Sequence, residues 1–200
     1  MPVSPEEDEM SRRFARALFF IFSVFIAIPS ICLSAADTQQ MSGLVYGDGY
    51  SFWIDAPKGW VLDPKTAKEY GLNVVLFQAG FSFRNAPAVM YTSKLKRNEK
   101  VADAMNHEAN TYREKYKGIQ ISRRPSIKTK DNKIALVQYY KGDKKDQTDE
   151  AVAFIQENGF IILLVLSARS DSAFDEAYPA YQDFVKSYAF ANIKVIDGTK

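Results

Sequence analysis

The chain has 200 residues, of which 46% are hydrophobic, 25% charged and 14% aromatic. This composition is typical of a folded globular protein and excludes disorder as the main state of the chain. At about 100 to 200 residues per domain, the length allows one domain and a short appendage. A formal net charge of +2 excludes polyanion binding as a property of the whole chain, and a single cysteine excludes an intrachain disulfide and a four-cysteine zinc site.

Residues 1–36 have the pattern of a secretory signal peptide. Arginines precede an uncharged, strongly apolar run, and Ser34-Ala35-Ala36 supplies small residues at its end. A positive flank, an apolar middle and a small-residue ending follow one another in such signals. We therefore predict cleavage before Asp37 and export by the general secretory route. The mature domain would then be 37–200, in the periplasm or outside the cell.

The alternative is an uncleaved N-terminal anchor in the inner membrane. The apolar run from Ala17 to Leu33 has 17 residues, at the lower edge of the roughly 17 to 25 that span a bilayer, and Pro29 interrupts it. In that case the domain would be tethered at the membrane, with its basic residues against anionic lipid.

Charge is distributed unevenly along the mature chain. From Lys94 to Lys145 there are 15 basic and 6 acidic residues, whereas 146–200 contains 4 basic and 9 acidic ones. We call residues 94–145 the basic sector. It would suit anionic headgroups, an acidic partner or an envelope polymer. The simpler interpretation is a solvated outer side of strands and one helix, because acidic residues are interleaved with the basic ones.

Strand and turn signals dominate the first part of the mature chain, after a solvated lead-in at Thr38–Leu44. Alternation in Tyr50–Ile54 predicts a strand with Trp53 on the face opposite Phe52, followed by a Pro-Lys-Gly turn. The pair Asp63-Pro64 predicts a short helix that ends before a glycine at position 71. Two further strands are expected at Asn73–Gln78 and Ala88–Leu95.

Two helices and four strands are predicted in the second part of the chain. Hydrophobic residues at helical spacing predict helices over 101–117 and 172–188. The second helix contains Pro179, which predicts either a kink or a short turn before the helix proper. Asn158-Gly159 between two apolar runs is a strong hairpin signal. The strands are expected at 126–129, 134–141, 151–156 and 160–168.

The run Phe160–Leu166 decides the expected architecture, because it is apolar on both faces. A strand tolerates this pattern where both sides of its sheet are covered. Hairpins make its neighbours antiparallel, and the amphipathic helices are available as covering layers. We therefore predict an α+β domain in which an antiparallel β-sheet is sandwiched between α-helices.

Several phrases of the sequence follow one another in the order of these elements. They are Tyr50–Trp60, a strand followed by Pro-x-Gly-Trp; Gly71–Phe77 before a glycine turn; Pro87–Tyr91; and the closing helix after 160–170. Together they resemble the PsbP-like family over about 44–190. The resemblance implies an α/β/α sandwich. It also implies a non-catalytic domain that binds or helps assemble other proteins, since members include extrinsic photosystem subunits and secreted proteins.

The mature chain shows no constellation that predicts catalysis, a cofactor or a bound metal. His107 lies away from the hydrophobic stripe of its predicted helix, so we expect it to face solvent. A Gly-x-Ser-x-Gly turn and the established nucleotide-binding glycine patterns are absent. Asp143, Asp146, Asp149 and Glu150 lack the spacing of a calcium loop, so a solvated loop is expected. Nucleic-acid binding would need aromatic residues interleaved with the basic sector, and export argues against such a partner.

Five residues are candidates for contact with a partner. Trp53 is either covered by a helical layer, which we expect, or an exposed aromatic anchor. Tyr139 and Tyr140 place one ring on each face of their strand, and we expect one ring to be exposed. Arg123 and Arg124 are candidates from the basic sector.

We interpret the chain as an exported, non-catalytic binding or assembly-accessory protein of the cell envelope, whose partner is a protein or another envelope component. A rival from another class is a small exported hydrolase or transferase that uses carboxylates such as Asp55 or Asp63 near Trp53 and Trp60. The rival requires a concave pocket with two convergent acids; Trp60 itself is expected in the core. The third hypothesis is the membrane-tethered domain.

Overall fold

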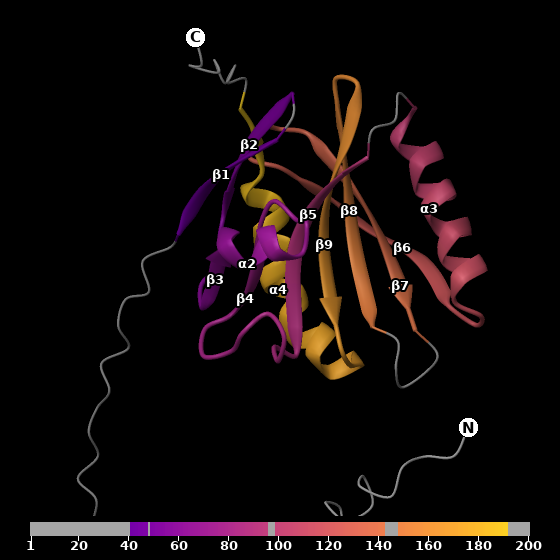
Figure 1. Ribbon diagram of the computed structural model, residues 1–200. Coiled ribbons are helices and arrows are strands. Elements are labelled where there is room, and N and C mark those ends of the chain that lie inside the picture. Colours follow the sequence, from indigo (N-terminus) through magenta and orange to yellow (C-terminus); the bar gives the residue numbers. More distant parts are fainter. Residues whose placement is uncertain (1–40, 48, 96–98, 143–147, 192–200) are drawn as a thin grey trace, which may run out of the picture. The chain divides into compact units, whose positions relative to one another are not determined.

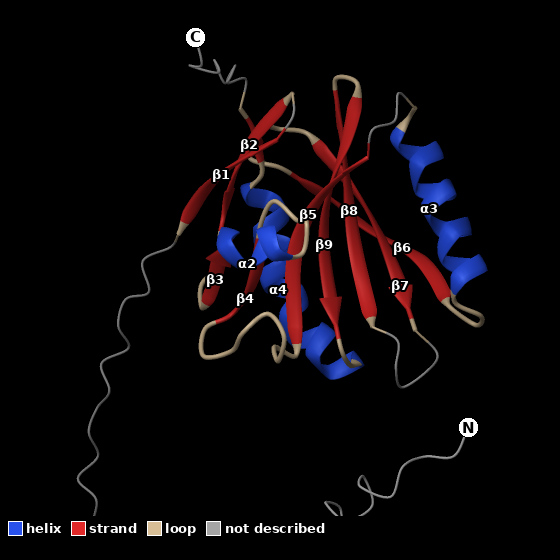
Figure 2. Cartoon of the chain, viewed as in Figure 1, coloured by secondary structure: helices blue, strands red, loops and turns tan. Residues whose placement is uncertain are grey.

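The computed structural model describes residues 41–47, 49–95, 99–142 and 148–191 (Figure 1). The predicted signal peptide or anchor at 1–36 lies outside these residues. The described part contains three helices and ten strands, and more of its residues lie in strands than in helices (Figure 2). No helix among the described residues is long and apolar enough to cross a bilayer. The elements are β1 (Ser42–Gly47), β2 (Tyr50–Asp55), β3 (Trp60–Asp63), α2 (Pro64–Glu69), β4 (Val75–Gln78), β5 (Ala88–Leu95), α3 (Val101–Lys115), β6 (Gln120–Lys128), β7 (Ile134–Lys141), β8 (Asp149–Glu157), β9 (Phe160–Ala168), α4 (Asp171–Ser187) and β10 (Ala189–Phe190).

Seven strands form one antiparallel sheet, the large sheet, in the order β3-β4-β5-β9-β8-β7-β6. β8 and β9 form the predicted hairpin, in which Glu157 pairs with Phe160 across Asn158-Gly159. Gly159 has a φ of 85°, a conformation that glycine adopts without a steric cost. The hairpin and the pairing with β5 place β9 at the centre of the large sheet.

β9 is buried on both faces, as its apolar sequence predicts. Its even-numbered residues pack in one core with α4, where Tyr181 Oη donates to the carbonyl of Leu164 at 3.0 Å. Its residues 161, 163 and 165 pack in another core with Met105 of α3. α3 and α4 therefore cover opposite faces of the large sheet (Figure 1), and the predicted α+β architecture with antiparallel strands is confirmed.

A second sheet, the small sheet, completes the layer that contains α4. β1, β2 and β10 form it in the order β1-β2-β10. Its inner side, with Val45, Phe52 and Ile54, packs in the same core as α4, and the ring of Phe52 lies 5.0 Å from that of Tyr188. The predicted sandwich of one sheet between helices is therefore incomplete, because α4 shares its side of the large sheet with the small sheet.

The short strands and the edge strand depart from the predicted boundaries. β1 occupies part of the predicted solvated lead-in, and β3 and β10 have no counterpart among the predicted strands. β6 begins at Gln120 rather than Ser126. It accommodates Pro125 because it is an edge strand and its register shifts between Arg124 and Ile127.

Two of the described helices, α2 and α4, start at capping side chains. Asp63 caps α2 and accepts a hydrogen bond from the backbone N–H of Thr66 at 3.0 Å. Ser170 Oγ accepts the N–H of Ala173 at 3.2 Å and caps α4. α4 then continues through Pro179 as one helix, so no separate turn precedes it. These caps fix where both helices meet the sheets.

Candidate functional site

The small sheet carries two exposed aromatic side chains, Tyr46 and Trp53. Leu44 pairs with Trp53 and Tyr46 with Ser51, while Ala189 pairs with Trp53 from the other side. Residues that pair across strands project to the same face of a sheet, which here is the face turned away from the core. Tyr46 is 66% exposed and Trp53 is 45% exposed. We call this surface the outer face: Leu44, Tyr46, Trp53 and Ala189. Ser51 lies on the same side of the sheet but is buried, and its hydroxyl donates to the carbonyl of Ala191 at 2.5 Å.

The expected covering of Trp53 by a helical layer is wrong. β2 lies in the small sheet, and α4 packs against the inner side of that sheet, where Ile54 is buried. Trp53 projects from the opposite side and remains exposed. Tyr46 belongs to no predicted element, because the predicted lead-in ends at Leu44 and the next predicted strand begins at Tyr50, whereas β1 extends to Gly47. The alternation of Leu44, Val45 and Tyr46 was the available signal, since only Val45 faces the core.

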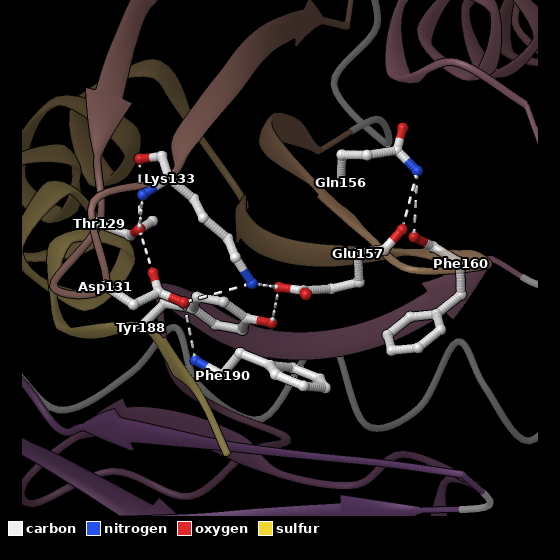
Figure 3. A network of polar contacts seen from close by, with 8 residues as sticks. All are labelled: Thr129, Asp131, Lys133, Gln156, Glu157, Phe160, Tyr188 and Phe190. Atoms are coloured by element: carbon white, nitrogen blue, oxygen red, sulfur yellow. Dashed lines mark hydrogen bonds and ion pairs between the residues drawn. The ribbon is translucent and has the colours of Figure 1, made fainter. Parts of the chain in front are cut away.

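A network of polar contacts holds β10, the strand beside Trp53, against the rest of the domain (Figure 3). Lys133 forms ion pairs with Glu157 and with Asp131, the second at 3.3 Å. Tyr188 Oη donates to Glu157 at 2.8 Å, and Asp131 accepts the backbone N–H of Phe190 in β10 at 3.0 Å. Glu157 is only 8% exposed, so its charge requires these partners. The outer face is therefore fixed by contacts at the strand that borders it.

At neutral pH, Asp131 and Tyr188 have the protonation states that the hydrogen bonds of this network require. Burial raises the pKa of Asp131, but hydrogen bonds from Thr129 and from the N–H of Phe190, with the charge of Lys133, outweigh burial and lower the pKa. Burial and then the charge of Glu157 raise the pKa of Tyr188. Asp131 is therefore ionised and Tyr188 protonated at neutral pH.

The other partner-contact candidates lie on β6 and β7 of the large sheet. The guanidinium of Arg124 lies 4.5 Å from the ring centroid of Tyr139 and 5.6 Å from that of Tyr178 in α4. Arg123 projects to the other face of β6, as successive strand residues do. Tyr139 and Tyr140 lie on opposite faces as predicted, but neither ring is exposed. Tyr140 is buried in the core under α3, and Tyr139 is half-buried against α4.

The exposed arginines of β6 also have a structural explanation. A free edge strand is open to pairing with another chain, and charged side chains and proline hinder such pairing. Arg123, Arg124 and Pro125 lie next to one another on this edge and are all exposed. Both arginines remain candidate contacts, whereas Tyr140 offers no surface to a partner.

The carboxylates of the hydrolase hypothesis have structural partners. Asp63 caps α2, and Asp55 accepts a hydrogen bond from Ser42 Oγ at 2.6 Å and lies 3.8 Å from Lys130 Nζ. His107 is exposed on α3, as expected. Within the described ranges, no group of three or more His, Cys, Asp or Glu residues is placed to hold a metal ion.

The predicted acidic loop is described in part. Positions 143 and 146 lie outside the described residues. Asp149 begins β8 and is buried, and Glu150 accepts hydrogen bonds from Tyr112 at 2.6 Å and from Ser167 at 3.0 Å. These two acids therefore belong to the sheet rather than to a solvated loop.

The architecture defines the class: an α+β protein in which helices lie on both faces of an antiparallel sheet and a small sheet shares one of these layers. Cyanobacterial PsbP (CyanoP) from Synechocystis sp. PCC 6803 is similar, with a TM-score of 0.51 and 12% identity over 80% of this chain and 97% of that chain. LpqN, involved in cell envelope biogenesis of Mycobacterium tuberculosis, is also similar, with a TM-score of 0.50 and 17% identity over 78% of this chain and 93% of that chain. The chain therefore has a PsbP-like fold. No protein-family model and no curated protein sequence matches it.

Proposed function

We propose that this chain is an exported, non-catalytic binding or assembly-accessory protein of the cell envelope, and that it docks a protein partner through the outer face of its small sheet. The observation that carries the proposal is the exposure of Trp53 and Tyr46 on one face of a well-anchored sheet. Tryptophan and tyrosine bury a large area at a low cost in conformational entropy, and they are enriched among the residues that dominate binding energy.

The surroundings of Trp53 resemble the anatomy of an interface. Leu44 lies directly opposite Trp53 on the neighbouring strand and extends the apolar centre. Ser42 and Asp55 lie at the end of the same strand pair, joined by their hydrogen bond, and supply a polar margin. An apolar centre with a polar margin is the usual arrangement in protein interfaces.

Two observations support a place in the cell envelope. The N-terminal segment has the order of a secretory signal. LpqN, whose fold is similar, is described as involved in cell envelope biogenesis. The structural engagement of Asp55 and Asp63 supports a binding role over hydrolysis. N-terminal sequencing of the exported protein tests the location: a start near Asp37 is expected, and a start at Met1 supports the tethered form.

The test of docking is affinity capture of the tagged chain from its native envelope, with wild type compared with Trp53→Ser and Phe81→Ser. Phe81 is 47% exposed, so F81S is a matched control for the loss of an exposed aromatic ring. W53S is expected to reduce recovery of the partner about tenfold or more, as truncation of a dominant interface residue does. F81S is expected to leave recovery unchanged. Equal recovery with W53S and wild type would contradict the proposal.

A further inference from the structure

A pocket of about 310 Å³ opens between the end of β1, the connection from α2 to β4, and the end of β5. This volume lies at the lower end of the roughly 300 to 1,000 Å³ that is typical of small-molecule sites. The pocket is distinct from the outer face, because Tyr50 projects to the inner side of β2. Its lining residues are Gly47, Tyr50, Gly71, Leu72, Asn73, Thr92, Ser93 and Lys94.

The pocket exists because β4 is shorter than its neighbour β5. The pairing of the two strands reaches Val75 opposite Tyr91, and β5 continues past this point from Thr92 onward. Gly47 closes one side of the pocket. A Cβ at this position would lie 2.5 Å from the ring of Tyr50, so a larger residue would displace that ring.

The lining is rich in hydrogen-bond donors. It contains a lysine, a side-chain amide and three hydroxyl groups, and none of the eight lining residues carries a carboxylate. Asn73 Nδ2 donates to Tyr50 Oη at 2.5 Å, which leaves the phenolic hydrogen to bond another acceptor. Burial raises the pKa of Tyr50 despite the opposing effect of Asn73, so the hydroxyl keeps its proton at neutral pH. Lys94 Nζ lies 4.3 Å from the centroid of the same ring and is a further hydrogen-bond donor at the wall of the pocket.

Thr92 supplies an independent sign of a ligand. Thr92 is one of the residues that line the pocket and is only 1% exposed, yet its Oγ1 has no hydrogen-bond partner in the described part of the chain. Buried hydroxyl groups are almost always paired, because an unpaired one costs the free energy of its lost hydration. A ligand oxygen at the base of the pocket would supply the missing partner.

We propose that this pocket binds a small organic molecule through a carboxylate or phosphate group, with Thr92, Tyr50 and Lys94 as donors. Both groups are oxyanions that accept several hydrogen bonds from a donor-rich site. The ring of Tyr50 and the side chain of Leu72 supply apolar surface for the rest of the molecule. The proposal goes beyond partner docking and does not depend on it.

The test is an NMR titration of the isotope-labelled full chain with benzoate and with phenyl phosphate, each compared with its uncharged analogue, benzamide or phenol. We expect saturable shifts of the Asn73 side-chain amide and the Thr92 methyl group with an anion, and no such shifts with the analogue. The tighter binder of the two anions identifies which oxyanion the site prefers.

Two variants test the proposed donors. Thr92→Val removes one of them, and Asn73→Ala removes the exposed amide that donates to the Tyr50 hydroxyl and holds this second donor in place. Each is expected to weaken binding of the anion about tenfold, whereas Trp53→Ser leaves it unchanged. The proposal is overturned by an absence of saturable shifts with both anions, by equal binding of the uncharged analogues, or by unchanged affinity in both T92V and N73A. Because W53S tests docking separately, either proposal can fail without the other.

Discussion

Replacing Thr92 by valine is expected to stabilise the protein, although the residue is buried in the wall of a pocket. The Thr92 hydroxyl lies out of water and without a partner in the described part of the chain. Burial of such a group costs roughly 1–3 kcal/mol. Valine has nearly the same shape and the same β-branch, so it removes this cost without leaving a cavity or changing the strand preference.

The expected gain for Thr92→Val is about 1 kcal/mol, the lower end of that range, because the adjacent pocket allows the side chain to relax. For a domain of this size, the gain corresponds to a rise in Tm of about 2–4 °C. Thermal and urea unfolding, followed by circular dichroism without added anion, measure it. The same substitution that weakens anion binding is thus expected to strengthen the fold.

Thr129→Val is the matched control. Thr129 is also buried, but its hydroxyl donates to Asp131 at 2.5 Å and accepts the N–H of Lys133 at 3.0 Å. Loss of these bonds is expected to destabilise the protein by roughly 1–3 kcal/mol. The two threonines should therefore respond with opposite signs. Destabilisation of T92V by an amount similar to that of T129V would refute the reasoning, since it would mean that the Thr92 hydroxyl is paired.

Three further predictions concern the tryptophans and the network in Figure 3. Trp53 is exposed and Trp60 is buried, so iodide should quench only the fraction of the tryptophan fluorescence that comes from Trp53. Trp53→Phe should remove this quenchable fraction, and unchanged quenching in W53F would contradict the exposure of Trp53. Lys133→Met should lower the free energy of unfolding by about 1–2 kcal/mol in urea titrations, because it leaves the buried carboxylate of Glu157 without its ion-pair partner. The loss is modest because Lys133 itself is partly exposed. Unchanged stability would contradict the role of Lys133 as the partner of Glu157. The pKa of Asp131 is lower in the folded protein than the unfolded value of about 3.9, so its charge stabilises the fold above that pH, and this stability is lost as the pH falls through the folded pKa. The variant Asp131→Asn should therefore unfold more easily at neutral pH, and its free energy of unfolding should depend less on pH in the acid range. An acid dependence equal to that of wild type would contradict this prediction.

The elements with strong local signals could be predicted from the sequence. β9 is apolar on both faces, the hairpin contains Asn158-Gly159, and α3 and α4 have hydrophobic stripes at helical spacing. Each of these signals lies within the element itself. β10 has only two residues, and it forms a strand because it pairs with Trp53 and Phe52 of β2, far away in the chain. No local pattern contains that information.

The candidate sites were harder to predict for a similar reason. Alternation placed Trp53 correctly opposite Phe52, but its exposure depends on β2 lying in a second sheet, which the pattern of one strand does not show. Thr92 looked like an ordinary strand residue. Its unpaired hydroxyl follows from where β4 ends relative to β5, a matter of length and register between two strands.

The pairing of β10 with β2 has a consequence for the order of events during biosynthesis. β10 follows every other described element along the chain, yet it is the strand that flanks Trp53. A polypeptide that emerges N-terminus first therefore cannot finish the small sheet until β9 and α4 have emerged as well. Docking through the outer face, as proposed, would then favour chains that have emerged through β10 over shorter fragments, which lack one of the two strands beside Trp53.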